Sequence, residues 1–259
     1  MHHALIAALV SLTLLVMPAW ADKSGAAGEK REPASTEEGI ALKMTPTFYH
    51  NSSATNAWDI NLRGNKGSHT AWVGYYRQEN EFQQLRGGYE HAIALPFVKL
   101  TPSLQFASRG FLGGSLNAEI GERYFALLGW GRTNLKAYYN LNFDPNDAIT
   151  VDVGTHALPN TTLSLYQIRD DRLHTRQHIT HLVARIKAGN KARWTFDVFR
   201  KSGRPDADPA SDTLRGAGAS ITFDYAAYFV RVANDPYVNF TNNHMVRVAA
   251  GMRFYRRPN

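Results

Sequence analysis

The chain of 259 residues contains no cysteine. This absence excludes disulfide scaffolding, thiolate metal sites and cysteine nucleophiles. It also excludes a lipid anchor attached to an N-terminal cysteine. Because no disulfide can form, the chain makes no use of an oxidising compartment. No motif in the sequence indicates a bound cofactor or a metal site of recognised spacing.

Long apolar runs are also lacking. Residues 4–16 (ALIAALVSLTLLV) form the one conspicuous run, and they are too few for a bilayer-spanning helix, which needs about 20 residues. Pro18 breaks the run, and Ala19-Trp20-Ala21 has the small–x–small pattern of a signal-peptidase site, although only His2 and His3 stand before the run in place of Lys or Arg. We expect a cleaved export signal over residues 1–21 and no inner-membrane helix.

Residues 22–38 are polar and contain no aromatic residue. Such a segment cannot bury enough apolar surface to fold, so the sequence predicts a disordered periplasmic N-terminal segment here.

From Gly39 onward, short segments alternate between apolar and polar residues. In the last of them, Met245–Tyr255, Val246 and Val248 share a face with Phe254, whereas Arg247 and Arg253 lie on the other face. Strand side chains alternate with a period of two, so each such segment has one oily and one polar face. The clearest further segments are Ala57–Arg63, Leu135–Phe143, Ile149–His156, Arg193–Lys201 and Ala227–Ala233.

Turn-forming residues separate about fifteen such runs, and the two longest polar connections are Ser202–Thr213 and Asn234–Asn243. A bacterial barrel with both ends in the periplasm needs an even number of strands. The sequence therefore predicts an all-β transmembrane antiparallel up-and-down barrel over residues 39–259, with fourteen strands, or twelve as the alternative, and short loops.

The final strand resembles the aromatic-ended terminal strand that Gram-negative outer-membrane β-barrel proteins present to the barrel-assembly machinery. Phe254 and Tyr255 carry the resemblance, with Arg256-Arg257-Pro258-Asn259 as an extension. It covers residues 39–255 at the level of the class and matches no particular family. It implies a multi-pass barrel in the Gram-negative outer membrane.

The charge balance is basic, with 29 Lys and Arg against 22 Asp and Glu. The cations are spread singly over many segments, and the chain is predicted to be exported, so a nucleic-acid partner is not indicated. Contact with outer-membrane lipid and lipopolysaccharide phosphates, or a lumen that favours anions, explains the balance better. The predicted lumen-lining residues are Asp59, Arg63, Lys136, Asp152, His156, Arg193, Asp197, Arg231, Arg247 and Arg253. They would line an open pore or pair into a polar plug.

His50-Asn51-Ser52 closes the first predicted strand, where His50 and Ser52 point the same way. This resembles the His–x–Ser arrangement of outer-membrane phospholipase A and of the lipid A 3-O-deacylases, which implies His50 as base and Ser52 as nucleophile. Asn56 and Asp59 are candidates to orient His50. The other interpretation is a polar hairpin loop.

A second cluster involves four residues of two neighbouring predicted hairpins. Asp152 and His156 share the polar face of one strand, and His174 and His178 follow on the next hairpin. Together they would permit a metal site or a general base, or they would form an ordinary polar network.

Three functional hypotheses follow. The first is a monomeric passive channel, porin-like, that transports small polar or anionic solutes. The second is a lipid-processing hydrolase or acyltransferase that uses His50 and Ser52. The third is a structural or adhesion barrel, against which the short loops count.

Overall fold

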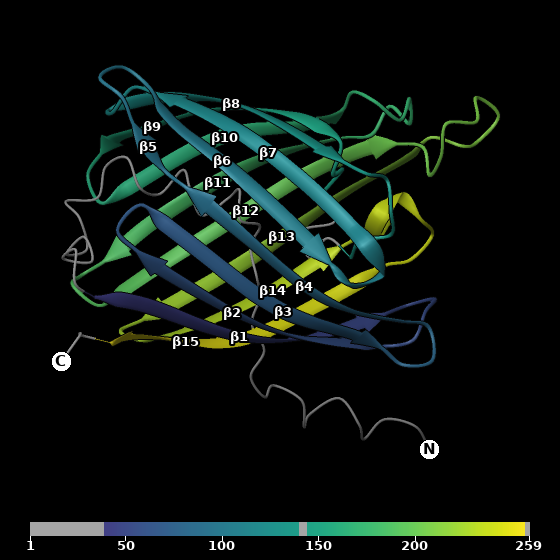
Figure 1. Ribbon diagram of the computed structural model, residues 1–259, viewed down its shortest axis with the longest axis horizontal. Coiled ribbons are helices and arrows are strands. Elements are labelled where there is room, and N and C mark those ends of the chain that lie inside the picture. The colour runs from purple at the N-terminus through teal and green to yellow at the C-terminus, as the bar shows by residue number, and fades with distance from the viewer. Residues whose placement is uncertain (1–38, 140–143, 257–259) are drawn as a thin grey trace.

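The computed structural model describes residues 39–139 and 144–256, so the predicted export signal and N-terminal segment lie outside the described residues. The described chain is a barrel of antiparallel strands whose axis runs across the page in Figure 1. The strands are β1 (Ile40–Asn51), β2 (Ala57–Lys66), β3 (His69–Gln78), β4 (Phe82–His91), β5 (Ile93–Ala94), β6 (Lys99–Ala107), β7 (Phe111–Ile120), β8 (Tyr124–Thr133), β9 (Ala148–Leu158), β10 (Thr161–Asp170), β11 (His178–Ala188), β12 (Ala192–Gly203), β13 (Leu214–Tyr225), β14 (Tyr228–Asp235) and β15 (Met245–Arg256).

Apart from β4 and β5, which do not pair with each other, each strand pairs with its neighbours in sequence, and two further pairings close the sheet. β1 pairs with β15 from Ile40–Arg256 to Asn51–Met245, and β4 pairs with β6. β5 also pairs with β6, so β4 and β5 together occupy one strand position in the barrel wall. The barrel therefore has fourteen strand positions, and the prediction of a fourteen-stranded up-and-down barrel is confirmed.

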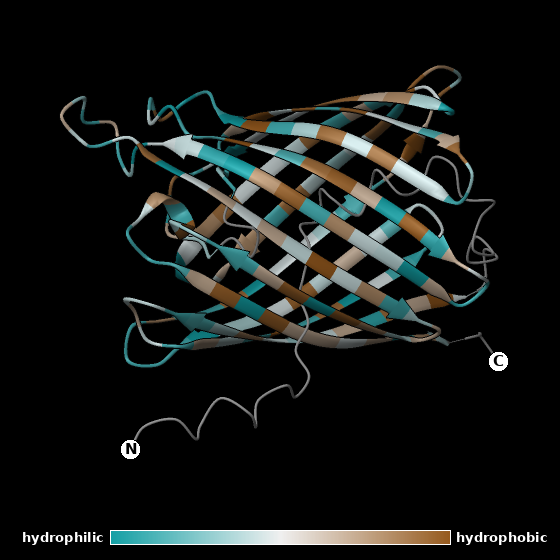
Figure 2. Ribbon diagram, turned by 180° about the vertical axis from the view of Figure 1, so that it is seen from behind, coloured by the Kyte–Doolittle hydropathy of each residue, from teal (hydrophilic) through white to brown (hydrophobic). Residues whose placement is uncertain are grey.

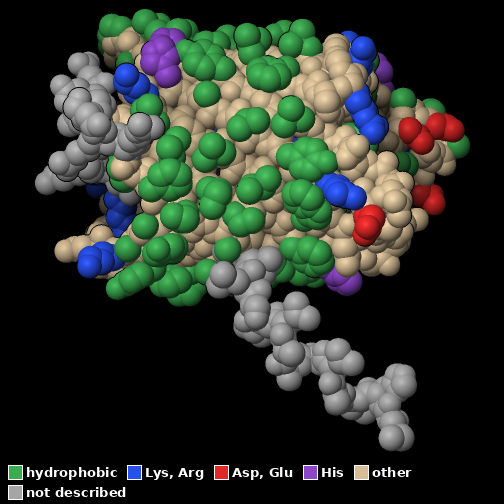
Figure 3. All heavy atoms as spheres, turned by 60° about the horizontal axis from the view of Figure 1, so that its bottom comes forward, with side chains coloured by type: hydrophobic (Ala, Val, Ile, Leu, Met, Phe, Trp, Pro, Cys, Tyr) green, Lys and Arg blue, Asp and Glu red, His purple; other side chains and the backbone are tan. Residues whose placement is uncertain are grey.

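The two faces of each strand differ as the alternation predicts. In β15, Val246 is 39% exposed on the outside, whereas Arg247 is 4% exposed and lies inside. The outward residues of the other strands are likewise large and apolar, including Trp58, Val73 and Leu104. Figure 2 shows these bands along the wall, and Figure 3 shows the hydrophobic side chains covering it between two charged ends. A surface this oily is suited to lipid rather than to water.

The two ends of the barrel differ in their connections. The described termini, Ile40 and Arg256, lie at the end where the turns are tight, such as the one between β11 and β12. The long connections all lie at the opposite end and span residues 134–147, 171–177, 204–213 and 236–244. Long loops of bacterial barrels are extracellular, so this end faces outward from the cell. Both connections predicted to be long are among them.

Two short 3-10 helices, η1 (Ser108–Gly110) and η2 (Val238–Phe240), lie in connections at the extracellular end. Among the described residues, no helix has the length and apolarity needed to cross a bilayer.

One predicted strand is wrong. Residues 135–139 of the predicted strand Leu135–Phe143 belong to no strand, and residues 140–143 lie outside the described residues. The alternation was real, but Leu135 has a positive φ of 60°, which bends the backbone out of the strand direction just after β8. We call residues 134–147 the inward loop, because its described residue Tyr139 stacks on the inward side chain of Tyr76.

Candidate functional site: the barrel interior

Charged side chains from nearly every strand line the interior. The inward cations of the described strands are Lys43, Arg63, Arg86, Lys99, Arg185, Lys187, Arg193, Lys201, Arg231, Arg247 and Arg253. The inward carboxylates are Asp59, Glu90, Glu119, Asp152, Asp170, Asp197, Asp224 and Asp235. Cations therefore outnumber carboxylates on the inner wall.

Nine of the ten predicted lumen residues lie on inward positions of strands. Lys136 does not, because it belongs to the inward loop, where its exposed side chain lies over Gly110 in the turn between β6 and β7. Its assignment to a strand face was wrong for the same reason as the strand itself.

The extracellular half of the interior is packed like a protein core. Arg86 of β4 donates to Asp59 of β2, and Lys201 of β12 donates to Asp235 of β14. The side chains of Arg86 and Asp59 are both 0% exposed. Such a desolvated pair persists only because the charges neutralise each other at close range.

The inward loop is fixed to the wall beside this pair. The guanidinium of Arg86 donates to the carbonyl of Tyr139 at 2.9 Å. The Gln84 side chain donates to the carbonyl of Ala137 at 2.9 Å and accepts from the Tyr139 N–H at 2.9 Å. The Tyr139 ring stacks on Tyr76 with centroids 3.4 Å apart. Two polar side chains of one strand therefore hold the loop backbone.

The base of the loop is fixed in the same manner. Asp147 accepts from the Thr133 N–H at 3.1 Å and from the Thr133 hydroxyl at 2.5 Å, and Arg172 pairs with Asp147 at 2.7 Å. The loop thus begins and ends against β8 and the connection that follows β10.

The two described parts of the loop, on either side of residues 140–143, have different neighbours. Tyr139 contacts β3, whereas the charges that act on Asp144 include His181 of β11 and Lys201 of β12. β3 and β11 are seven positions apart in the ring of fourteen. Burial raises the pKa of Asp144 to about 6, and burial also raises the pKa of Tyr139, which keeps its phenol neutral.

A second connection, residues 236–244, covers the same end. Val238 is buried against Tyr49 and Tyr76 of β1 and β3, and Phe240 is buried against Ile179 and Phe199 of β11 and β12. Two loops therefore narrow the extracellular mouth.

The periplasmic half is lined by ion pairs that keep contact with water. Asp224 accepts from Arg253 at 2.6 Å and from Arg193 at 3.3 Å, and the two arginine side chains are 25% and 30% exposed. Lys99, which pairs with Glu119 at 3.3 Å, is also 30% exposed. The polar side chains of the interior are therefore more exposed at the periplasmic end than at the extracellular end.

Three residues that join the inward loop to the wall were missed from the sequence: Gln84, Arg86 and Tyr139. The signal for the first two was present, because β4 reads FQQLRGGYEH and places Gln84, Arg86 and Glu90 on one face. Nothing in the spacing shows that Tyr139 returns into the barrel.

His50 and Ser52 lie on the outer surface at the extracellular rim, both exposed. His50 Nδ1 lies 3.1 Å from Asn56 Oδ1, whereas Ser52 Oγ accepts from the His244 N–H at 2.9 Å. Asp59, the other candidate to orient His50, faces inward and pairs with Arg86. The catalytic roles of His50 and Ser52 stay a prediction.

The second predicted cluster does not assemble. Asp152 and His156 face the lumen, where His156 Nδ1 lies 2.9 Å from Thr162 Oγ1. His178 points outward from β11, and His174 lies in the loop before it. Among the described residues, no group of three His, Cys, Asp or Glu is placed to hold a metal ion. The inward histidine of this region is instead His181, which lies 2.9 Å from Asp197.

No protein-family model and no curated protein matches this sequence. Solved structures do match. The outer membrane protein Omp33 of Acinetobacter baumannii is 10% identical with a TM-score of 0.56, over 84% of this chain and 100% of that one. OprD from Pseudomonas aeruginosa is 7% identical with a TM-score of 0.46, over 88% and 96%. OmpF of Salmonella typhi, crystallised with daunomycin, is 9% identical with a TM-score of 0.45, over 83% and 97%.

Likeness at such low identity establishes the fold alone, and only the first of these TM-scores exceeds 0.5. The closed barrel, the oily outer wall and the polar interior define the class. The protein is a Gram-negative outer-membrane β-barrel, and it resides in the outer membrane.

Proposed function

We propose that the protein is a passive channel for small polar solutes, with a preference for anions, and that the inward loop forms its constriction. The observation that carries the proposal is the polar, predominantly basic inner wall, which a purely structural barrel does not need. The proposal is supported by part-exposed ion pairs at the periplasmic end, as in a wide entrance, and by a loop fixed to the wall at the extracellular end, as in a narrow filter.

The preference for anions rests on where the excess cations lie. Arg231 of β14 has Arg247 of β15 and Arg185 of β11 among its strongest electrostatic neighbours, with Asp197 as the opposing charge. Arg231 also donates to the hydroxyl of Ser220 at 3.0 Å, which leaves its charge unneutralised by that contact. A wall with this balance attracts anions and repels cations along the path.

The test is a recording from planar bilayers that separate two KCl concentrations. The proposal expects channels of small conductance whose reversal potential has the sign of chloride permeation. A cation-selective channel would overturn the solute preference. Protein that migrates as a folded barrel on unboiled gels but gives no channels would overturn the channel itself.

One observation favours a second candidate, hydrolysis or transfer of lipid acyl chains. The hydrogen bond between His50 and Asn56 supplies the orienting contact that a His–Ser pair requires, and both residues of the pair are exposed at the level of the outer leaflet. On this hypothesis His50→Ala and Ser52→Ala each abolish fatty-acid release from phospholipid or lipid A in detergent. Ser53→Ala, a neighbouring serine that also contacts Asn243, is the control and keeps the activity. Unchanged lipid products in both variants would remove the hypothesis.

A further inference from the structure

The outer wall of β10–β13 carries a row of basic side chains near its extracellular end. Strand register places Arg169 opposite His178, His178 opposite Ser202, and Ser202 opposite Arg215. One step toward the membrane centre, Arg200 lies on the same outer face. We call Arg169, His178, Arg200 and Arg215 the basic row. Adjacent strands lie about 4.8 Å apart, so these charges share one patch of wall.

The arginines of the basic row are not neutralised within the protein. Among the described residues, no carboxylate lies within ion-pair distance of Arg169, Arg200 or Arg215. The outward Arg132 of β8 is different, because its guanidinium forms a bidentate pair with Asp171.

The acidic residues of the nearby loops make contacts of their own. Asp170 accepts from the N–H groups of Leu173 and Thr175, which shapes the loop after β10. Asp206 accepts from the Asp208 N–H and from the Ser211 hydroxyl within the loop after β12.

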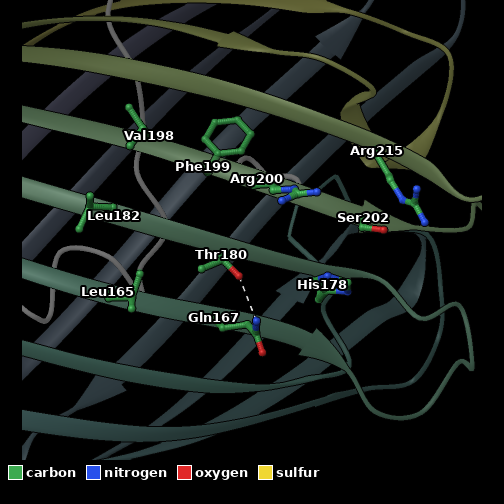
Figure 4. A pocket seen from close by; sticks show the side chains of 10 residues that line it. All are labelled: Leu165, Gln167, His178, Thr180, Leu182, Val198, Phe199, Arg200, Ser202 and Arg215. Carbon is green, nitrogen blue, oxygen red and sulfur yellow. Dashed lines mark hydrogen bonds between the residues drawn. The ribbon is translucent and has the colours of Figure 1, made fainter.

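Below the basic row the wall changes from polar to oily. Arg200 is paired in register with Thr180, and Thr180 with Gln167, whose side chain donates to the Thr180 hydroxyl at 3.0 Å. Two residues farther along each strand, the outward side chains are Val198, Leu182 and Leu165. These side chains line a groove of about 700 Å³ on the outside of the barrel. Figure 4 shows the charged and polar side chains toward the loop end of the groove and the three aliphatic residues farther along.

We propose that this groove binds the phosphorylated diglucosamine head of lipopolysaccharide, with its acyl chains against Leu165, Leu182 and Val198. Three arginines and a histidine above an oily strip match a lipid that carries phosphate at its head and chains beneath. The choice of lipopolysaccharide follows from position, since the row lies at the long-loop end, which faces the outer leaflet where this lipid resides. Arginine guanidinium groups are suited to phosphate, to which they donate two parallel hydrogen bonds.

The opposite wall supports the assignment by contrast. At the corresponding level, the register row across β1–β4 reads Phe48, Trp58, Arg77 and Gln83, with one arginine among aromatic and amide side chains. A general attraction of the barrel for anionic lipid would need no such difference between the two walls. The basic row is therefore a localised site.

The test measures binding of defined lipids to the purified full-length barrel by native mass spectrometry in detergent. The probes are bisphosphorylated lipid A, the same lipid A with both phosphates removed, and phosphatidylglycerol. The wild type should retain bisphosphorylated lipid A in preference to the other two. Arg200→Gln with Arg215→Gln should weaken that binding about tenfold, as expected for the loss of two ion pairs at an exposed surface. Arg77→Gln is the matched control and should bind as the wild type does.

Three results would overturn the proposal. They are equal binding by the Arg200→Gln/Arg215→Gln variant and the wild type, equal weakening by Arg77→Gln, and equal retention of phosphatidylglycerol and bisphosphorylated lipid A. The three lipids compared on the wild type decide the matter even if the double variant fails to fold. Arg200→Lys with Arg215→Lys, which keeps the charge, should recover part of the binding.

Discussion

The two halves of the lumen use the same residue types in different surroundings. In the extracellular half the Arg86–Asp59 pair is 0% exposed on both sides, whereas in the periplasmic half Arg193 is 30% exposed beside Asp224. Strand alternation points all four side chains inward, so the strands do not cause the difference. The loops cause it, because the inward loop and the connection over Val238 and Phe240 exclude water from one end only.

This contrast assigns different roles to similar ion pairs. A buried pair is costly to break because the remaining charge has no solvent, whereas a solvated pair contributes little to stability but acts on ions that pass. The extracellular pairs should therefore control the structure of the constriction, and the periplasmic pairs should control selectivity. The following experiments test that division.

The largest effect is expected from breaking the buried pair. Arg86→Met removes the buried partner of Asp59 and also the donor to the Tyr139 carbonyl. We expect a loss of roughly 3–5 kcal/mol in the free energy of unfolding, measured by urea denaturation of the refolded barrel. The matched change in the periplasmic half is Arg193→Met, where Asp224 keeps Arg253 and the loss should stay below about 1 kcal/mol. Equal losses would contradict the contrast between the two halves.

Loosening the inward loop should come next. Tyr139→Ala removes the stacking on Tyr76, which is worth roughly 1 kcal/mol beyond the buried area. The loop should then leave its docked position for a larger fraction of the time, and single-channel conductance should rise several-fold. Tyr228→Ala, a tyrosine on the outer wall, should leave conductance as it is. A conductance that does not respond to Tyr139→Ala would mean that the loop is not the constriction.

Selectivity should respond to the periplasmic pair with little change in stability. Arg193→Gln together with Arg253→Gln removes both cations around Asp224. The reversal potential in a KCl gradient should move toward that of a cation channel. Asp224→Asn should move it in the other direction. Two shifts of the same sign would exclude a direct electrostatic effect of these side chains.

The smallest effect concerns pH. Burial raises the pKa of Asp144 from its ordinary value near 3.8 to about 6, so the docked loop favours the protonated carboxyl. Docking is therefore strongest below about pH 4 and weakens as pH rises from about 4 to about 6. We expect mean conductance to increase over this range, and Asp144→Asn should flatten this dependence. A conductance that falls with rising pH would reverse the sign and contradict the assignment.

The period of two was enough to predict the barrel. It set the inward face of segments as different as Ala57–Arg63 and Met245–Tyr255, because lipid outside and polar lumen inside impose opposite preferences on alternate residues. The strand number followed from the requirement for an even count, and the positions of the two predicted long connections followed from turn chemistry.

The position of the inward loop could not be predicted in the same way. Leu135–Phe143 alternates as well as any true strand, and only its tertiary contacts distinguish it. Tyr139 is held by Gln84 and Arg86, which come more than fifty residues earlier in the chain. Local periodicity contains no information about such contacts. The hydrogen-bond partner of His50 could be predicted, because Asn56 is only six residues away in the sequence.

The most direct test replaces residues 136–145 of the inward loop with a short Gly-Ser turn between β8 and β9 and compares single-channel conductance with that of the wild type. The channel account predicts small anion-selective channels in the wild type and a several-fold larger conductance in the shortened protein. If the shortened barrel folds, as its heat-dependent gel mobility would show, and conducts no better than the wild type, the inward loop is not the filter and the account fails.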